Sequence, residues 1–174
     1  MVEATEREAI EKGLRVLWFI WAAMLGSLLI YVFVCHQFGE EIRQTASPDF
    51  PAAQLKNALY IAAITTLFIT YFLRKLILSG RFSSSDAKLF KPETASNQPS
   101  FLSKYTIAMI VSLAFSESIG IYGLVLFLVG DSFQTLHIFT GISAAAMFFY
   151  RPKREDIETL ATAMHTTSAS PPGH

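Results

Sequence analysis

Four long apolar segments separated by polar stretches set the pattern of this 174-residue chain. Each is near the length of about 20 residues that an α-helix needs to cross the hydrocarbon core of a bilayer. None alternates polar and apolar residues with the period of two that is typical of membrane β-strands. The pattern therefore predicts an all-α polytopic membrane protein with four transmembrane helices, at residues 16–35, 56–78, 104–130 and 133–150.

The polar stretches between and beside these spans are too short for a soluble catalytic domain. We expect residues 1–15 to extend the first span as a helix on the cytoplasmic side and residues 36–55 to form an outer loop. Residues 79–103, rich in Ser, Lys and Pro, are expected to form a flexible cytoplasmic loop, and residues 151–174 a cytoplasmic tail.

Lys and Arg are unevenly distributed beside the four spans, which predicts their orientation. The segments 1–15, 74–104 and 151–154 are rich in basic residues, whereas the loop 36–55 contains only Arg43. Cytoplasmic flanks of membrane helices carry an excess of Lys and Arg. The sequence therefore predicts that both termini are cytoplasmic, which requires an even number of spans.

Composition narrows the possible partners. The chain is 52% hydrophobic and 16% charged, with a formal net charge of zero, which is too apolar for an ordinary soluble domain. There is no excess of basic residues to attract nucleic acid, so the expected partner is the lipid bilayer. Cys35 is the single cysteine, so no intrachain disulfide can form. We expect no cofactor and no bound metal.

Small residues line one face of the third span. Ala108, Ser112, Ser116 and Gly120 recur at intervals of four, and Gly123 lies beside the end of this stripe. Such spacing lets another helix backbone approach closely, which is how helices associate in lipid. The favoured interpretation is packing within the chain. The alternative is self-association or contact with a partner in a membrane complex.

Glu117 is an acidic residue near the middle of the third span, about 20 Å along the helix from Lys104 and from Asp131. An ionised acid at this depth costs about 3 kcal/mol, and keeping it protonated at neutral pH costs a similar amount. Modest changes in its surroundings could therefore switch its form, as a proton-binding site requires. We name Glu117, Ser116 and Ser118 as candidate ion-binding residues. In the alternative, Glu117 is a protonated acid that only joins helices by a hydrogen bond.

Other candidate chemistry is sparse. His36 and His137 lie toward the outer side, and each is a lone histidine for which an interfacial position is the favoured interpretation over haem ligation. The Ser116–Glu117–Ser118 triplet has no His or Lys nearby in the sequence to activate a serine. We therefore expect that the protein is not an enzyme.

The stretch FSESIGIYGLVLFLVG, residues 115–130, resembles the carboxylate-bearing helix of the proteolipid (c-type) subunits of rotary ATPases. The resemblance implies that Glu117 matches the ion-binding acid, with Gly120, Tyr122 and Gly123 in the segment after it. It is confined to this helix, since the span at residues 56–78 contains no glycine, unlike the glycine-rich first helix of that family.

A wider stretch, KYTIAMIVSLAFSESIGIYGLVLFLVG followed by YRPKRE, is similar to a group of small bacterial four-span membrane proteins without an assigned activity. This resemblance covers residues 104–155 and implies the fold and a location in the bacterial inner membrane. From the sequence we thus predict a proton- or cation-binding membrane subunit that uses Glu117. The alternative is a structural or accessory subunit of a membrane complex.

Overall fold

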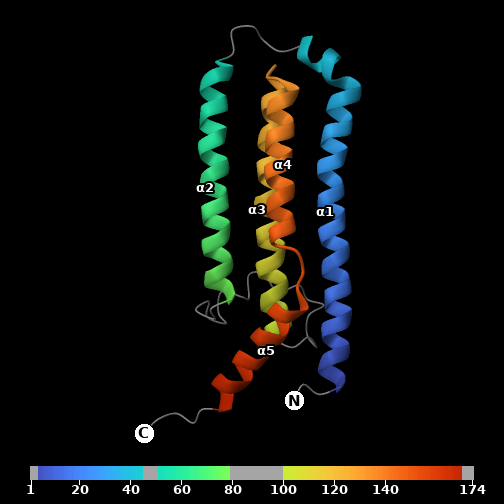
Figure 1. Ribbon diagram of the computed structural model, residues 1–174, viewed down its shortest axis with the longest axis vertical. Coiled ribbons are helices and arrows are strands. Elements are labelled where there is room, and N and C mark those ends of the chain that lie inside the picture. Colours follow the sequence, from blue (N-terminus) through green and yellow to red (C-terminus); the bar gives the residue numbers. More distant parts are fainter. Residues whose placement is uncertain (1–3, 45–50, 79–99, 170–174) are drawn as a thin grey trace.

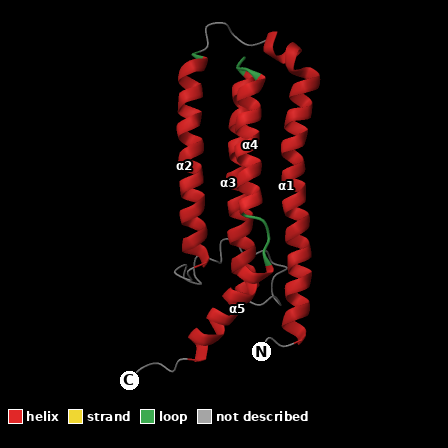
Figure 2. Cartoon of the chain, viewed as in Figure 1, coloured by secondary structure: helices red, strands yellow, loops and turns green. Residues whose placement is uncertain are grey.

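The computed structural model describes residues 4–44, 51–78 and 100–169 of the chain, and within them every regular element is an α-helix (Figures 1 and 2). This confirms the all-α prediction. The helices follow one another as α1 (Ala4–Gln44), α2 (Ala52–Leu78), α3 (Ser100–Leu128), α4 (Phe133–Phe149) and α5 (Arg154–Ala169).

Helix α3 is the centre of the arrangement and packs against all the others. Figure 1 shows α1 to α4 upright, with α1 and α2 on either side of the α3–α4 pair. Helix α5 turns away at the end where α1 begins and α2 ends. Its buried residues Ile157 and Ala161 join a core cluster with Ile10 of α1 and Leu102 of α3.

Three helices contain stretches long and apolar enough to cross a bilayer, at Ile10–Gly39, Ala53–Leu78 and Leu102–Leu128. Helix α4 is also apolar but has only 17 residues. It ends where Tyr150 and Arg151 precede Pro152, because a residue before proline is disfavoured in helical conformation. The chain therefore has the helices of a membrane protein, and α4 is the shortest of the apolar ones.

The helices and the expected spans differ at their ends. Helix α1 continues to Gln44, well beyond residue 35, and takes in much of the expected outer loop. Helix α5 lies within the expected tail, where the sequence analysis placed no helix. The expected flexible loop, 79–103, falls almost entirely on residues 79–99, which lie outside the described residues.

Large apolar side chains cover the outer faces of the helices. Phe19 of α1 is 77% exposed, and Phe68 and Phe72 of α2 and Phe149 of α4 are each at least 65% exposed. Soluble monomers rarely expose contiguous apolar surfaces of this kind. The exposed faces therefore suit contact with lipid tails.

The small residues of α3 lie at its contacts with α1 and α4. Ala108, Ser112, Ser116, Gly120 and Gly123 are all buried. The hydroxyl of Ser143 on α4 donates to the carbonyl oxygen of Ser116 at 2.6 Å. The intramolecular contacts that the favoured interpretation requires are thus present on this face.

Gly123→Ala should destabilise the protein, whereas Gly141→Ala should not. A Cβ at position 123 would lie 2.6 Å from Cβ of Phe139 and 3.3 Å from the carbonyl oxygen of Leu136, so α4 would have to move. Overpacking of this kind costs about 1–3 kcal/mol. A Cβ at Gly141 meets no atom within 4 Å, so Ala there keeps its advantage in helix propensity. Melting temperatures in detergent would check this, and equal melting of the two variants would contradict it.

Candidate functional site

Glu117 lies at the edge of the one stripe of α3 that the other helices leave open. Ile110, Ala114, Ile121 and Val125 are exposed along this stripe, and Glu117 shares their side of the helix by its spacing of seven from Ile110 and four from Ile121. Glu117 itself is half-buried. Its side chain is therefore partly covered.

Helix α1 supplies that cover through two hydroxyl groups one turn apart. Ser27 Oγ lies 2.5 Å from Oε1 of Glu117, and the phenol oxygen of Tyr31 lies 3.0 Å from the same atom. Residues four apart lie on the same face of a helix, so both side chains reach the acid from one side. Glu117 is thus the centre of a polar contact between apolar stretches of two helices.

Ser27 also contacts its own helix. Its Oγ lies 2.7 Å from the carbonyl oxygen of Met24, three residues earlier. Serine side chains in helices commonly bond a backbone carbonyl of the preceding turn. The hydroxyl therefore lies between two oxygen atoms.

The serines that flank Glu117 in sequence bond elsewhere. Ser116 Oγ donates to the carbonyl oxygen of Ser112, and Ser118 Oγ donates to that of Ala114. Each of these bonds spans four residues within α3. The structure therefore brings Glu117 together with Ser27 and Tyr31 and does not bring it together with the hydroxyls of Ser116 and Ser118.

Basic side chains lie at the two ends of the bundle, away from Glu117. Among the described residues, Lys56 pairs with Asp131, Arg74 with Asp156, and Arg154 with Glu11 and Glu158, and none pairs with Glu117. A carboxyl group without a cation close by must be stabilised by hydrogen bonds alone. Those bonds come from α1.

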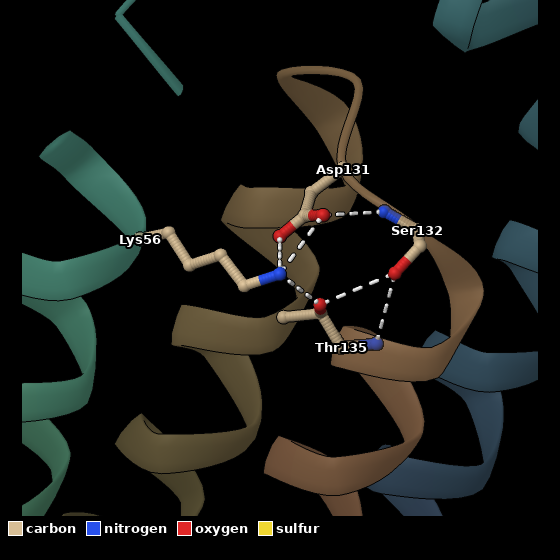
Figure 3. A network of polar contacts seen from close by, with 4 residues as sticks. All are labelled: Lys56, Asp131, Ser132 and Thr135. Carbon is tan, nitrogen blue, oxygen red and sulfur yellow. Dashed lines mark hydrogen bonds and ion pairs between the residues drawn. The ribbon is translucent and has the colours of Figure 1, made fainter. Parts of the chain in front are cut away.

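A polar network closes the end of the bundle at the α3–α4 turn (Figure 3). Lys56 Nζ of α2 lies 3.3 and 3.1 Å from the two carboxylate oxygens of Asp131 and donates to Thr135 Oγ1 at 2.9 Å. The backbone N–H of Ser132 donates to Oδ1 of Asp131 at 2.7 Å. Gly130, at φ 98°, lets the chain reverse before this network.

Asp131 is held as a carboxylate by these contacts. Burial alone would raise its pKa, but the N–H of Ser132 and the ammonium group of Lys56 outweigh this and lower the pKa below its usual value. Hydrogen bonds and a cation that favour the charged form have this effect. The network therefore ties α2 to the α3–α4 turn.

The opposite end of the bundle is closed by Arg74. Its Nη2 lies 3.2 Å from Oδ2 of Asp156 on α5, and its guanidinium carbon lies 5.3 Å from the centre of the Tyr150 ring. The hydroxyl of Tyr105 accepts from the backbone N–H of Lys153 at 3.0 Å. These contacts hold the α4–α5 connection against α2 and α3.

The two histidines lie near Phe133, at the end of the bundle that holds the α3–α4 turn. His36 and His137 are exposed, and the rings of both approach that of Phe133, at 5.5 and 6.4 Å between centres. Nδ1 of His137 lies 2.6 Å from the carbonyl oxygen of Phe133. Within the described part of the chain, no group of three His, Cys, Asp or Glu side chains could hold a metal ion.

Ser27 and Tyr31 were absent from the candidate residues chosen from sequence. Both are polar positions in the first apolar span, spaced by four like the partners of a helical face. That spacing is a signal that could have singled them out. Which helix they face depends on the arrangement of the bundle, which the spacing does not give.

Comparisons of this chain with family models, with curated proteins and with solved structures found no match.

Asp131→Asn should lower the melting temperature at neutral pH and have little effect in acid. Because the pKa of Asp131 is lower in the folded protein, its stabilising contribution is present above the ordinary carboxyl pKa of about 4 and is lost as the pH falls below it. Thermal unfolding in detergent from pH 7 to pH 3 would show this.

The matched control is Glu158→Gln, which removes the exposed pair with Arg154 and should change melting little at either pH. A deficit of Asp131→Asn that persisted undiminished at the lowest pH would show that the charge of Asp131 does not stabilise the fold.

Proposed function

We propose that this chain is an integral protein of the bacterial inner membrane with four spans, and that Glu117 is a titratable group that binds a proton or another cation. The observation that carries the proposal is the position of Glu117, a carboxyl group far from both ends of α3 that is bonded by two hydroxyl groups and no cation. Ionisable residues inside a membrane are costly and usually functional.

The positions of the helix ends support an even number of spans. Helix α1 begins near α5, since Arg154 of α5 approaches Glu11 of α1 at 4.0 Å and Ile10 and Ile157 share a core cluster. A chain that starts and finishes at one end of a bundle crosses it an even number of times. Helix α4 has 17 residues and is about 26 Å long. The residues directly before and after it can supply the remaining length of a hydrocarbon core of about 30 Å.

Basic residues support a cytoplasmic location for that end. Arg15, Lys75, Lys104 and Arg151 lie toward it, whereas Lys56 at the other end is paired with Asp131. Cytoplasmic flanks are richer in Lys and Arg. This distribution of basic residues supports the proposed orientation.

The depth and exposure of Glu117 favour ion binding. It lies 13 residues after Lys104 and 14 before Asp131, or about 20 Å from each. It lies at the edge of a stripe of exposed apolar residues, so the packed core does not enclose it. The resemblance of residues 115–130 to the acidic helix of proteolipid subunits favours the same function.

A structural or accessory function is the second candidate, and the same hydrogen bonds favour it. Ser27 and Tyr31 join α1 to α3 through Glu117, which is what an interhelical bond does in a membrane. Such a protein would use its exposed apolar faces to bind a membrane partner or a second copy of itself. The two candidates differ in whether Glu117 must exchange a proton.

Single cysteines at Ala53 and Thr159, each in a Cys35→Ala background, should be labelled from opposite sides of the membrane. Both positions are exposed, at the start of α2 and within α5. With four spans and the proposed orientation, Ala53 faces outward and Thr159 faces the cytoplasm. Labelling of sealed cells and of inverted vesicles with an impermeant maleimide checks this. Labelling of both positions from outside would mean that α4 does not cross.

A hydrophobic carbodiimide should modify Glu117 in folded protein at mildly acidic and neutral pH. The reagent partitions into the bilayer and reacts with a protonated carboxyl group, and the reaction should fade as the pH is raised. Mass spectrometry of the peptide containing residue 117 measures it. Glu117→Gln is the matched control, since it keeps hydrogen bonding but removes the reactive group. Absence of modification at every pH would rule out the ion-binding function and leave the accessory one.

A further inference from the structure

The hydroxyl group of Ser27 has one hydrogen but two close oxygen neighbours. Its Oγ lies 2.7 Å from the carbonyl oxygen of Met24 and 2.5 Å from Oε1 of Glu117. A carbonyl oxygen can only accept a hydrogen bond. If Ser27 donates to Met24, the short contact with Glu117 requires a hydrogen that belongs to Glu117.

We propose that a directed chain of hydrogen bonds holds Glu117 as the neutral carboxylic acid, so that the ligand of this site is a proton rather than a metal cation. The inference rests on the proposed function, because it identifies the ion that the same site binds. The chain runs from the phenol of Tyr31 to Oε1 of Glu117, from the acid hydrogen to Ser27 Oγ, and from the Ser27 hydroxyl to the Met24 carbonyl.

The number of hydrogens available for these contacts distinguishes a protonated Glu117 from an ionised one. Three oxygen–oxygen contacts, at 2.5, 2.7 and 3.0 Å, need three hydrogens, and Tyr31, Ser27 and the protonated acid supply one each. A carboxylate leaves only two hydrogens for the three contacts. One of the two contacts of Ser27 would then bring lone pairs together, which is unfavourable away from water.

The same hydrogens leave few lone pairs for a metal ion. Hard cations such as Ca²⁺ take about six to eight oxygen ligands. Here Oε1 of Glu117 already accepts from Tyr31, and the carbonyl of Met24 accepts from Ser27. The arrangement is complete with one proton. Apart from Oε2 of Glu117, these four residues offer a metal few oxygen atoms that are not already engaged.

Tyr31 is the titratable group that α1 places against Glu117. Lys56 of α2 pairs with Asp131 at one end of the bundle, and Arg74 of α2 pairs with Asp156 of α5 at the other. Arg154 of α5 pairs with Glu11 and Glu158, and no ion pair among the described residues includes Glu117. His137 of α4 bonds the carbonyl of Phe133. The protonation of Glu117 is therefore governed by Ser27 and Tyr31.

The midpoint pH of carbodiimide labelling at Glu117 tests this in protein reconstituted into vesicles of neutral lipid. Ser27→Ala removes the acceptor of the acid hydrogen, so it should weaken the neutral form and move the midpoint about one unit to lower pH. Ser27→Thr keeps the hydroxyl and should restore the wild-type midpoint. Melting temperatures establish that each variant is folded before labelling.

Tyr31→Phe is the opposing control. Tyr31 donates to Oε1 whether Glu117 is charged or neutral, and a hydrogen bond to a carboxylate is the stronger one. Its loss should therefore move the midpoint to higher pH, opposite to the effect of Ser27→Ala. A shift of both variants to higher pH would show that Ser27 donates to a carboxylate and would overturn the proposal.

Replacement of choline chloride by sodium chloride should leave the labelling of wild-type protein unchanged. Protection by sodium would show that the site binds a metal cation, so the ion-binding function would stand and the proton assignment would fall. Absence of wild-type labelling at every pH would instead remove the ion-binding function, and the proton assignment with it.

Discussion

Close approach of helix backbones along α3 is the constraint on which the rest of this structure depends. Apolar side chains gain little by exchanging lipid tails for another helix, so membrane helices associate through close packing and interhelical hydrogen bonds. Gly123 lies against Phe139, and the hydroxyl of Ser143 bonds the carbonyl of Ser116. With α4 fixed on this face, α1 packs beside it and covers Glu117 with Ser27 and Tyr31.

The polar contacts divide into two kinds with different consequences. At the ends of the bundle, Lys56 with Asp131 and Arg74 with Asp156 are ion pairs that join helices where water can reach them. In the middle, Glu117 is bonded by neutral hydroxyl groups alone. A pair at an end stabilises two opposite charges, whereas the central carboxyl group has no cation beside it. In the proposed function, protonation of Glu117 is coupled to the contact between α1 and α3.

Much of the fold followed from the sequence, and less of the site did. Helicity and the apolar spans depend on local patterns, so the all-α prediction is confirmed, as is the presence of long apolar helices. Helix α5 was missed because its buried residues Ile157 and Ala161 are few and lie in a polar segment. Glu117 was recognisable from the sequence because an acidic residue in the middle of an apolar span has a high free energy in lipid. Its partners depend on which helix lies beside α3, and no local pattern specifies that.

Infrared spectroscopy of the reconstituted protein tests the central claim most directly. The difference between wild-type protein and Glu117→Gln at neutral pH isolates the carboxyl group of this residue. If Glu117 is held neutral between Tyr31 and Ser27, the difference spectrum contains the carbonyl stretch of a protonated carboxylic acid, which disappears at alkaline pH. A spectrum that contains only carboxylate bands at neutral pH would contradict the account.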